Sequence, residues 1–262
     1  MDYETITSSK KNRVATILLN RPDKRNAISE TMGQELVDCL NRCEDDSTIK
    51  AIILTGKGSV FCAGGDIDAS EFFADSPKLK VKRLLNASLP AILEIRRIKK
   101  PVVAAVNGPA LGGGFGLALA CDLIIAAKSA SFGSHYVLLG VSPDAGVSYF
   151  LPYLIGDKKA AWLMFTGEVV SAQGGYELGF VNQVIEDDRL LDAADNIAVR
   201  LSSMATLAIA RTKELINRSW YAGLETHMEQ EKRFMADLAL TEDFKESLLA
   251  FREKRKPRYK GR

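Results

Sequence analysis

The stretch that decides the fold runs from Pro101 to Asp122 and reads PVVAAVNGPALGGGFGLALACD. Val102 to Val106 are all apolar, which predicts a strand buried on both faces, and the Asn-Gly-Pro at 107 to 109 ends it. Four glycines follow where a helix is expected to begin, at 112, 113, 114 and 116. Without side chains, the amide N–H groups at that positive helix end are open to an oxygen atom. The stretch therefore predicts a place that holds negative charge.

Two other interpretations of this stretch stay open. Residues 110 to 127 are almost continuously apolar, as in a membrane span, but Asp122 interrupts the run and the glycines weaken a helix. The glycines could also serve only to let a helix pack closely on a sheet.

The composition is that of a globular protein. The chain has 262 residues, 47% of them hydrophobic and 26% charged, with a formal net charge of +2. This balance gives no reason to expect a nucleic-acid or membrane partner. The segment from Met1 to Glu4 is acidic and has no apolar run, so we expect no secretory signal and a cytoplasmic location.

The cysteines are too sparse for a disulfide framework, at positions 39, 43, 62 and 121. Cys39 and Cys43 are four residues apart on a predicted helix, but neither His135 nor His227 is near them in sequence to complete a metal site. We therefore expect reduced thiols and no metal.

Elements before and after the central stretch indicate an α/β fold. Residues 14–19, 51–55 and 123–127 are predicted to be further strands, and a helix with Ser29 as its N-cap lies between the first two. The second half is predicted to be mostly helical, with helices over 157–167, from Ser171 and over 241–256, and a strand over 181–185. We place a boundary near residue 200, which separates a core of residues 1–200 from a helical region of residues 201–262.

A second glycine turn follows the predicted strand at 51–55 and reads FCAGGDI from Phe61 to Ile67. Two such turns, each at the end of a buried strand, could direct one amide each at the same oxygen. A pair of N–H donors is what stabilises an enolate or a tetrahedral oxyanion.

The sequence resembles the crotonase superfamily, the enoyl-CoA hydratases and isomerases, over essentially its whole length. The resemblance rests on NRPDKRNA at 20–27, the turn at 61–67, residues 100–114, Ser171-Ala172 with Gly179, and FREKRKP at 251–257. It implies a spiral of strand-strand-helix turns, a trimer or hexamer assembled through residues 201–262, and a thioester carbonyl held between two backbone amides. The acyl-CoA is then the substrate, and no further cofactor is implied.

Matched position by position, the resemblance assigns the two oxyanion amides to Gly65 and Gly113. It also implies a CoA-binding set that comprises Lys24, Ala63, Asp66, Ile67, Phe251 and Lys254, with the last two on a neighbouring or same-trimer C-terminal tail that closes over CoA.

The departures from the family pattern concern the catalytic acids. Hydratases use two glutamates to activate water and to protonate carbon, and the matching positions here are Gly116 and Tyr136. Addition of water needs both a base and an acid, so their absence argues against efficient hydration. Asp144, in the turn GVSPDAG at 140–146, matches the single acidic residue of enoyl-CoA isomerases and of the phenylacetate-pathway ring isomerases.

We therefore predict an enoyl-CoA isomerase in which Asp144 moves a proton and Tyr136 lines the acyl pocket. Asp144 could also simply cap a turn beside Pro143. Three other functions stay open: a weak hydratase, an acyl-CoA-binding scaffold without turnover, and a hydrolase or dehalogenase with Asp144 as nucleophile. The last also requires a histidine and a tryptophan where this chain has Leu93 and Tyr136. Loops such as residues 68–90 are expected to shape the acyl pocket.

Overall fold

The computed structural model of the chain describes residues 3–67, 77–220, 224–238 and 240–262. Its main sheet has six strands in the order β1 (Ile6–Lys11), β2 (Val14–Leu19), β3 (Ala51–Gly56), β4 (Val102–Val106), β6 (Leu123–Ala127) and β9 (Gln183–Ile185). Within the described part of this sheet, β1 and β2 pair antiparallel and the other neighbouring strands pair parallel. A smaller sheet comprises β5 (Ala110–Leu111), β7 (Ser131–Gly133) and β8 (Val169–Ser171).

The predicted buried strands are confirmed. Every residue of β3 and β4 is buried, as their uninterrupted apolar sequences require in a sheet covered on both faces. The strand predicted over 181–185 is shorter, because Phe180 and Val181 donate their amides to Gly175 O and close the end of the preceding helix instead.

The chain alternates between the two sheets, which produces a spiral. It passes from β4 to β5 and, after a helix, from β6 to β7. Two isolated parallel bridges, Ile28 to Gly65 and Cys62 to Ala110, extend the smaller layer toward the earlier turns. The predicted α/β spiral of strand-strand-helix turns is confirmed, and it brings the two glycine turns together although they are far apart in sequence.

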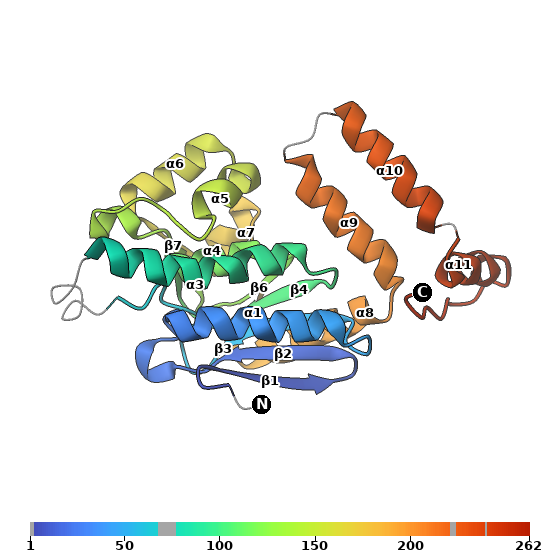
Figure 1. Cartoon of the computed structure of the whole chain (residues 1–262), viewed down its shortest axis with the longest axis horizontal. Coiled ribbons are helices and arrows are strands. Elements are labelled where there is room, and N and C mark those ends of the chain that lie inside the picture. Colours follow the sequence, from blue (N-terminus) through green and yellow to red (C-terminus); the bar gives the residue numbers. More distant parts are fainter. Residues whose placement is uncertain (1–2, 68–76, 221–223, 239) are drawn as a thin grey trace.

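Helices cover the sheets on both sides (Figure 1). They are α1 (Glu30–Asp45), α3 (Pro77–Arg97), α4 (Gly113–Ala120), α5 (Val147–Ile155), α6 (Asp157–Thr166), α7 (Ala172–Leu178) and α8 (Leu190–Ser202), with short 3-10 turns η1 (Pro22–Lys24), η2 (Tyr136–Leu139) and η3 (Asp187–Arg189). Ser29 caps α1 as predicted, its Oγ accepting from Met32 N at 3.1 Å.

One prediction about the acyl pocket is wrong. Residues 77–90 are not loop but the first part of α3, and residues 68–76 lie outside the described residues. Pro90 lies inside this helix, where its ring removes one backbone hydrogen bond.

The C-terminal part consists of α9 (Thr206–Ser219), α10 (Leu224–Leu238) and α11 (Glu242–Arg252), which extend away from the spiral (Figure 1). Lys213 fixes α9 to the spiral, because its buried Nζ donates to Ile95 O at 2.7 Å, Lys100 O at 3.1 Å and Asp122 Oδ2 at 2.7 Å. The last helix ends before the predicted residue 256, because Lys254 is left-handed (φ +54°).

The described residues contain no helix long and apolar enough to cross a bilayer and no His, Cys, Asp and Glu cluster suited to a metal. All four cysteines are buried, and none forms a disulfide.

Candidate active site

The first glycine turn directs the amide of Gly65 toward the start of α4. Ile28 N donates to Gly64 O at 2.7 Å, and Asp66 N donates to Ile28 O at 2.9 Å. These two bonds occupy one edge of the extended segment. Because backbone groups alternate along a strand, the N–H of Gly65, between them, faces the opposite edge.

The second glycine turn lies at that edge. Gly112, with φ +50° and ψ −121°, is the N-cap of α4 in a conformation that requires glycine. A Cβ placed on Gly113 would be 3.7 Å from Gly65 N and 3.8 Å from Asp144 Oδ1. The missing side chain of Gly113 therefore leaves one small space beside both an amide nitrogen and a carboxylate.

Asp144 reaches this space from the turn that precedes α5. The turn is tight, since Ala145 has φ +48° and Gly146 has φ +77°. Burial raises the pKa of Asp144, and the hydroxyl of Tyr136, which donates to Asp144 Oδ1 at 2.5 Å, partly opposes that effect. A carboxylate in these surroundings is a stronger base than a solvated one.

The same turn fills the position where hydratases carry their first glutamate. A Cβ on Gly116 would lie 2.4 Å from Ala145 O and 2.6 Å from Ala145 Cβ. The chain therefore lacks both the carboxylate and the room for one. At the second position, the side chain of Tyr136 is 6% exposed and is bonded to Asp144.

A small cavity joins these groups. Its lining combines Gly65, Gly113 and Asp144 with apolar side chains of α1, α3 and α4, and it encloses about 20 Å³. That volume is sufficient for about one water molecule. The Cδ2 of Leu84 is 3.0 Å from the Cβ position of Gly65, so the end of this side chain covers the space beside Gly65.

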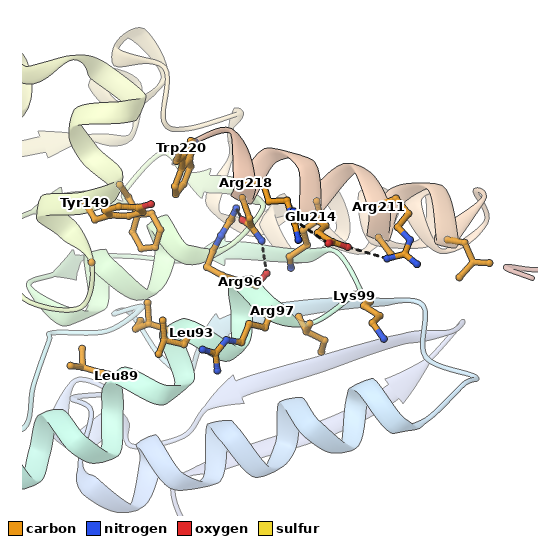
Figure 2. A pocket seen from close by; sticks show the side chains of 18 residues that line it. Leu89, Leu93, Arg96, Arg97, Lys99, Tyr149, Arg211, Glu214, Arg218 and Trp220 are labelled. Atoms are coloured by element: carbon orange, nitrogen blue, oxygen red, sulfur yellow. Dashed lines mark hydrogen bonds and ion pairs between the residues drawn. The ribbon is translucent and has the colours of Figure 1, made fainter. Parts of the chain in front are cut away.

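A much larger cavity of about 880 Å³ lies between α3, α5 and α9 (Figure 2). Leu89, Leu93, Tyr149 and Trp220 surround one end, and the charged Arg211 and Glu214 lie toward the other. It adjoins the small cavity, since both are lined by Ile92. Gly65, Gly113 and Asp144, the residues predicted to carry the chemistry, line the small cavity and not the large one.

Four of the predicted CoA-binding residues lie near one another. Lys24 is exposed in η1, and Ala63 N donates to Arg25 O at 3.1 Å, which joins this segment to the first glycine turn. Asp66 follows in that turn, and the exposed side chain of Ile67 comes next. The carboxylate of Asp66 is already paired with Arg21, whose Nη2 is 2.7 Å from Asp66 Oδ2.

Sequence reasoning missed the residue that fixes this loop, Asn26. It is fully buried with φ +54°; its Oδ1 accepts from Arg21 N at 3.0 Å, and its Nδ2 donates to Lys57 O at 3.0 Å and Val60 O at 2.7 Å. The tolerance of asparagine for left-handed backbone was the available signal.

The structure does not bring Phe251 and Lys254 to this site within one chain. Phe251 is in the last turn of α11, and Lys254 follows the end of that helix. In Figure 1, α11 lies at the right-hand end of the molecule, beyond α9 from the half of α3 that covers Gly65.

The sequence model of the enoyl-CoA hydratase/isomerase family matches residues 9–262. The chain belongs to that family. Among curated relatives, the 1,2-epoxyphenylacetyl-CoA isomerase of Escherichia coli (strain K12) is 34% identical over 263 residues, which cover 99% of each chain. The crotonyl-CoA hydratase of Syntrophomonas wolfei is also 34% identical, over 260 residues and 99% of each chain.

The family assignment extends to solved structures. An enoyl-CoA hydratase from Bacillus anthracis superposes with a TM-score of 0.93 at 35% identity, covering 99% of this chain and 100% of that one. The names within the enoyl-CoA hydratase/isomerase family thus include both reactions, and the residues of this chain have to distinguish them.

Proposed function

We propose that this member of the family is an enoyl-CoA isomerase that moves a double bond from the β,γ to the α,β position. The observation that carries the proposal is the grouping of Gly65, Gly113 and Asp144 around one small cavity, with the backbone of Ala145 in the place of a hydratase glutamate at Gly116.

The proposed reaction needs one base and one oxyanion site. The thioester oxygen of the substrate accepts from the amides of Gly65 and Gly113, which lowers the free energy of the enolate. The ionised Asp144 takes a proton from C2, and the resulting dienolate carries its negative charge on that oxygen. Asp144 then returns the proton to C4, so that the double bond lies between C2 and C3 and the enzyme is regenerated.

The surroundings of Asp144 favour this reaction over hydration. The cavity wall is formed by Ile28, Leu36, Leu84, Leu85 and other uncharged residues, so a water molecule would meet no second carboxylate among the described residues. Hydration needs an acid and a base together, whereas a proton shuttle needs one group that serves as both in turn.

The proposal includes the remaining family features. The CoA part would lie along Lys24, Ala63, Asp66 and Ile67, with no additional cofactor and a cytoplasmic location. We propose a trimer, or a hexamer of two trimers, in which α11 brings Phe251 and Lys254 to a neighbouring subunit. Exposed apolar side chains on the C-terminal helices support such contacts, among them Ile216, Met235, Leu248 and Leu249.

Proton exchange tests the proposed function. A 3-enoyl-CoA incubated with the protein in deuterated water should incorporate deuterium at C2 or C4 and yield the 2-enoyl-CoA, as followed by NMR. Asp144→Asn should slow this by roughly 10²- to 10⁴-fold, the usual contribution of a general base. Binding with neither deuterium exchange nor formation of the 2-enoyl-CoA would instead indicate a scaffold. Release of free CoA from a benzoyl thioester would indicate Asp144 as nucleophile.

A further inference from the structure

Tyr136 contacts two parts of the candidate site, the N-cap of α4 and the carboxylate of Asp144. It begins η2 after the left-handed His135, and its own amide donates to Ser134 O at 2.7 Å. The ring lies beside the N-cap of α4, since a Cβ on Gly112 would be 3.8 Å from Tyr136 Cζ. From there its hydroxyl donates to Asp144 Oδ1 at 2.5 Å.

Tyr136 is the one side-chain donor to Asp144 among the described residues. The elements packed around the carboxylate offer it no charge: α1, α3 and α4 contribute aliphatic side chains and Ser88, and the glycine turns contribute backbone. Near the Tyr136 hydroxyl, burial raises the pKa of the Cys62 thiol to about 12, so that thiol is neutral.

We propose that Tyr136 is a positioning residue that holds the carboxylate of Asp144 toward the space beside Gly113 and Gly65, where the proton moves. This inference rests on the proposed isomerase function. The oxygen that accepts from the phenol, Oδ1, is also the one 3.8 Å from the Cβ position of Gly113, so the hydrogen bond opposes rotation of the carboxylate out of that space.

The acid–base properties of the pair agree with this role. Burial raises the pKa of Tyr136, and the charge of Asp144 raises it further, so the phenol keeps its proton and serves only as a donor. The bond stabilises the ionised form of Asp144 more than the protonated form, which keeps the buried aspartate ionised to lower pH.

Tyr136→Phe tests the inference through the pH dependence of deuterium exchange. The variant keeps the ring against Gly112 and removes only the hydroxyl. We expect the midpoint of the acid limb to rise by about one pH unit and the plateau rate to fall roughly tenfold, the usual effect of losing a hydrogen bond to a charged group. The affinity for a saturated acyl-CoA should not change. Tyr3→Phe is the matched control, because the Tyr3 hydroxyl donates to Asp38 on the surface at 2.8 Å; its profile should equal that of the wild type.

A second variant should shift the midpoint of the acid limb in the opposite direction. It also provides a test if Tyr136→Phe does not fold. Replacing Tyr136 by 3-fluorotyrosine makes the phenol a stronger donor, so the acid limb should move to lower pH. An acid limb that stays in place in both variants overturns the inference while leaving the isomerase proposal intact, provided that Asp144→Asn abolishes exchange. Exchange that survives in Asp144→Asn overturns both.

Discussion

The backbone of Ala145 lies where a side chain on Gly116 would have to be, with its carbonyl oxygen 2.4 Å from the Cβ position. Because of this contact, position 116 has no room for a glutamate side chain. The site therefore differs from a hydratase site in the path of its backbone as well as in the missing carboxylate. It depends on the left-handed conformation of Ala145, which brings the loop against α4 and points Asp144 into the cavity.

Restoring the glutamate should therefore not restore hydration. Gly116→Glu should unfold at lower urea concentration and show no addition of water to a 2-enoyl-CoA, because the new side chain displaces the turn that carries Asp144. Gly116→Ala should already lower the free energy of unfolding by about 1–3 kcal/mol, as overpacking does. Appreciable hydration by Gly116→Glu would contradict this account.

Gly113→Ala is the matched substitution in the same helix. Unlike Gly116→Ala, it should leave the stability of the fold intact. Its Cβ meets nothing closer than 3.7 Å, so stability should be kept or slightly raised. The methyl group would occupy the space beside Gly65 N, and deuterium exchange should fall sharply. Urea unfolding and exchange measured on both variants separate the two effects.

The rate of deuterium exchange by the wild type should rise with pH in a single transition and should not fall again. Exchange needs ionised Asp144, so the rate should rise with pH through the raised pKa of this group and then stay level, since the pKa of Tyr136 is raised as well. A bell-shaped profile between pH 4 and 9 would indicate a second essential acid and would favour a two-carboxylate mechanism.

The stability of the protein should also depend on pH through the ionisation of Asp144. Because the pKa of Asp144 is raised on folding, its contribution to stability is full below the pKa of free aspartate, about 4, and is lost as pH rises through the higher value. Asp144→Asn should therefore raise the melting temperature at pH 7, by an amount that shrinks toward pH 4. Asp187→Asn should lower it at pH 7, because bonds from Ser129 lower the pKa of Asp187.

The attachment of α9 should depend on Lys213. Lys213→Met removes three hydrogen bonds and the nearer of the two cations beside the partly buried Asp122, which keeps Arg96 Nη1, at 3.4 Å from its Oδ1. Loss of one member of a buried pair costs about 3–5 kcal/mol. Lys128→Met is the control, since its pair with Glu186 is exposed and should contribute at most about 1 kcal/mol. Equal unfolding midpoints for the two variants would rule out this role.

Local patterns were sufficient to predict the strands, the helix that begins at Ser29 and the two glycine turns, because burial on both faces and missing side chains are visible in the residues themselves. The family resemblance supplied the pairing of Gly65 with Gly113. The spiral and its bridges are consistent with that pairing.

The remainder depends on contacts that a single sequence does not display. The bond between Tyr136 and Asp144 requires a left-handed residue at His135, which no periodicity predicts. The helix over 77–97 was not predicted, because lysines and Pro90 obscure its apolar face. The obstruction of Gly116 by Ala145 likewise follows from an unusual backbone angle in a distant loop.

The most direct test compares two substrates with one preparation of the protein. A 3-enoyl-CoA and a 2-enoyl-CoA of equal chain length are offered separately, and the products are separated by chromatography. We predict that the 3-enoyl-CoA is converted to the 2-enoyl-CoA and that the 2-enoyl-CoA yields no 3-hydroxyacyl-CoA at a comparable rate. Rapid formation of 3-hydroxyacyl-CoA, unaffected by Asp144→Asn, would contradict the proposed chemistry.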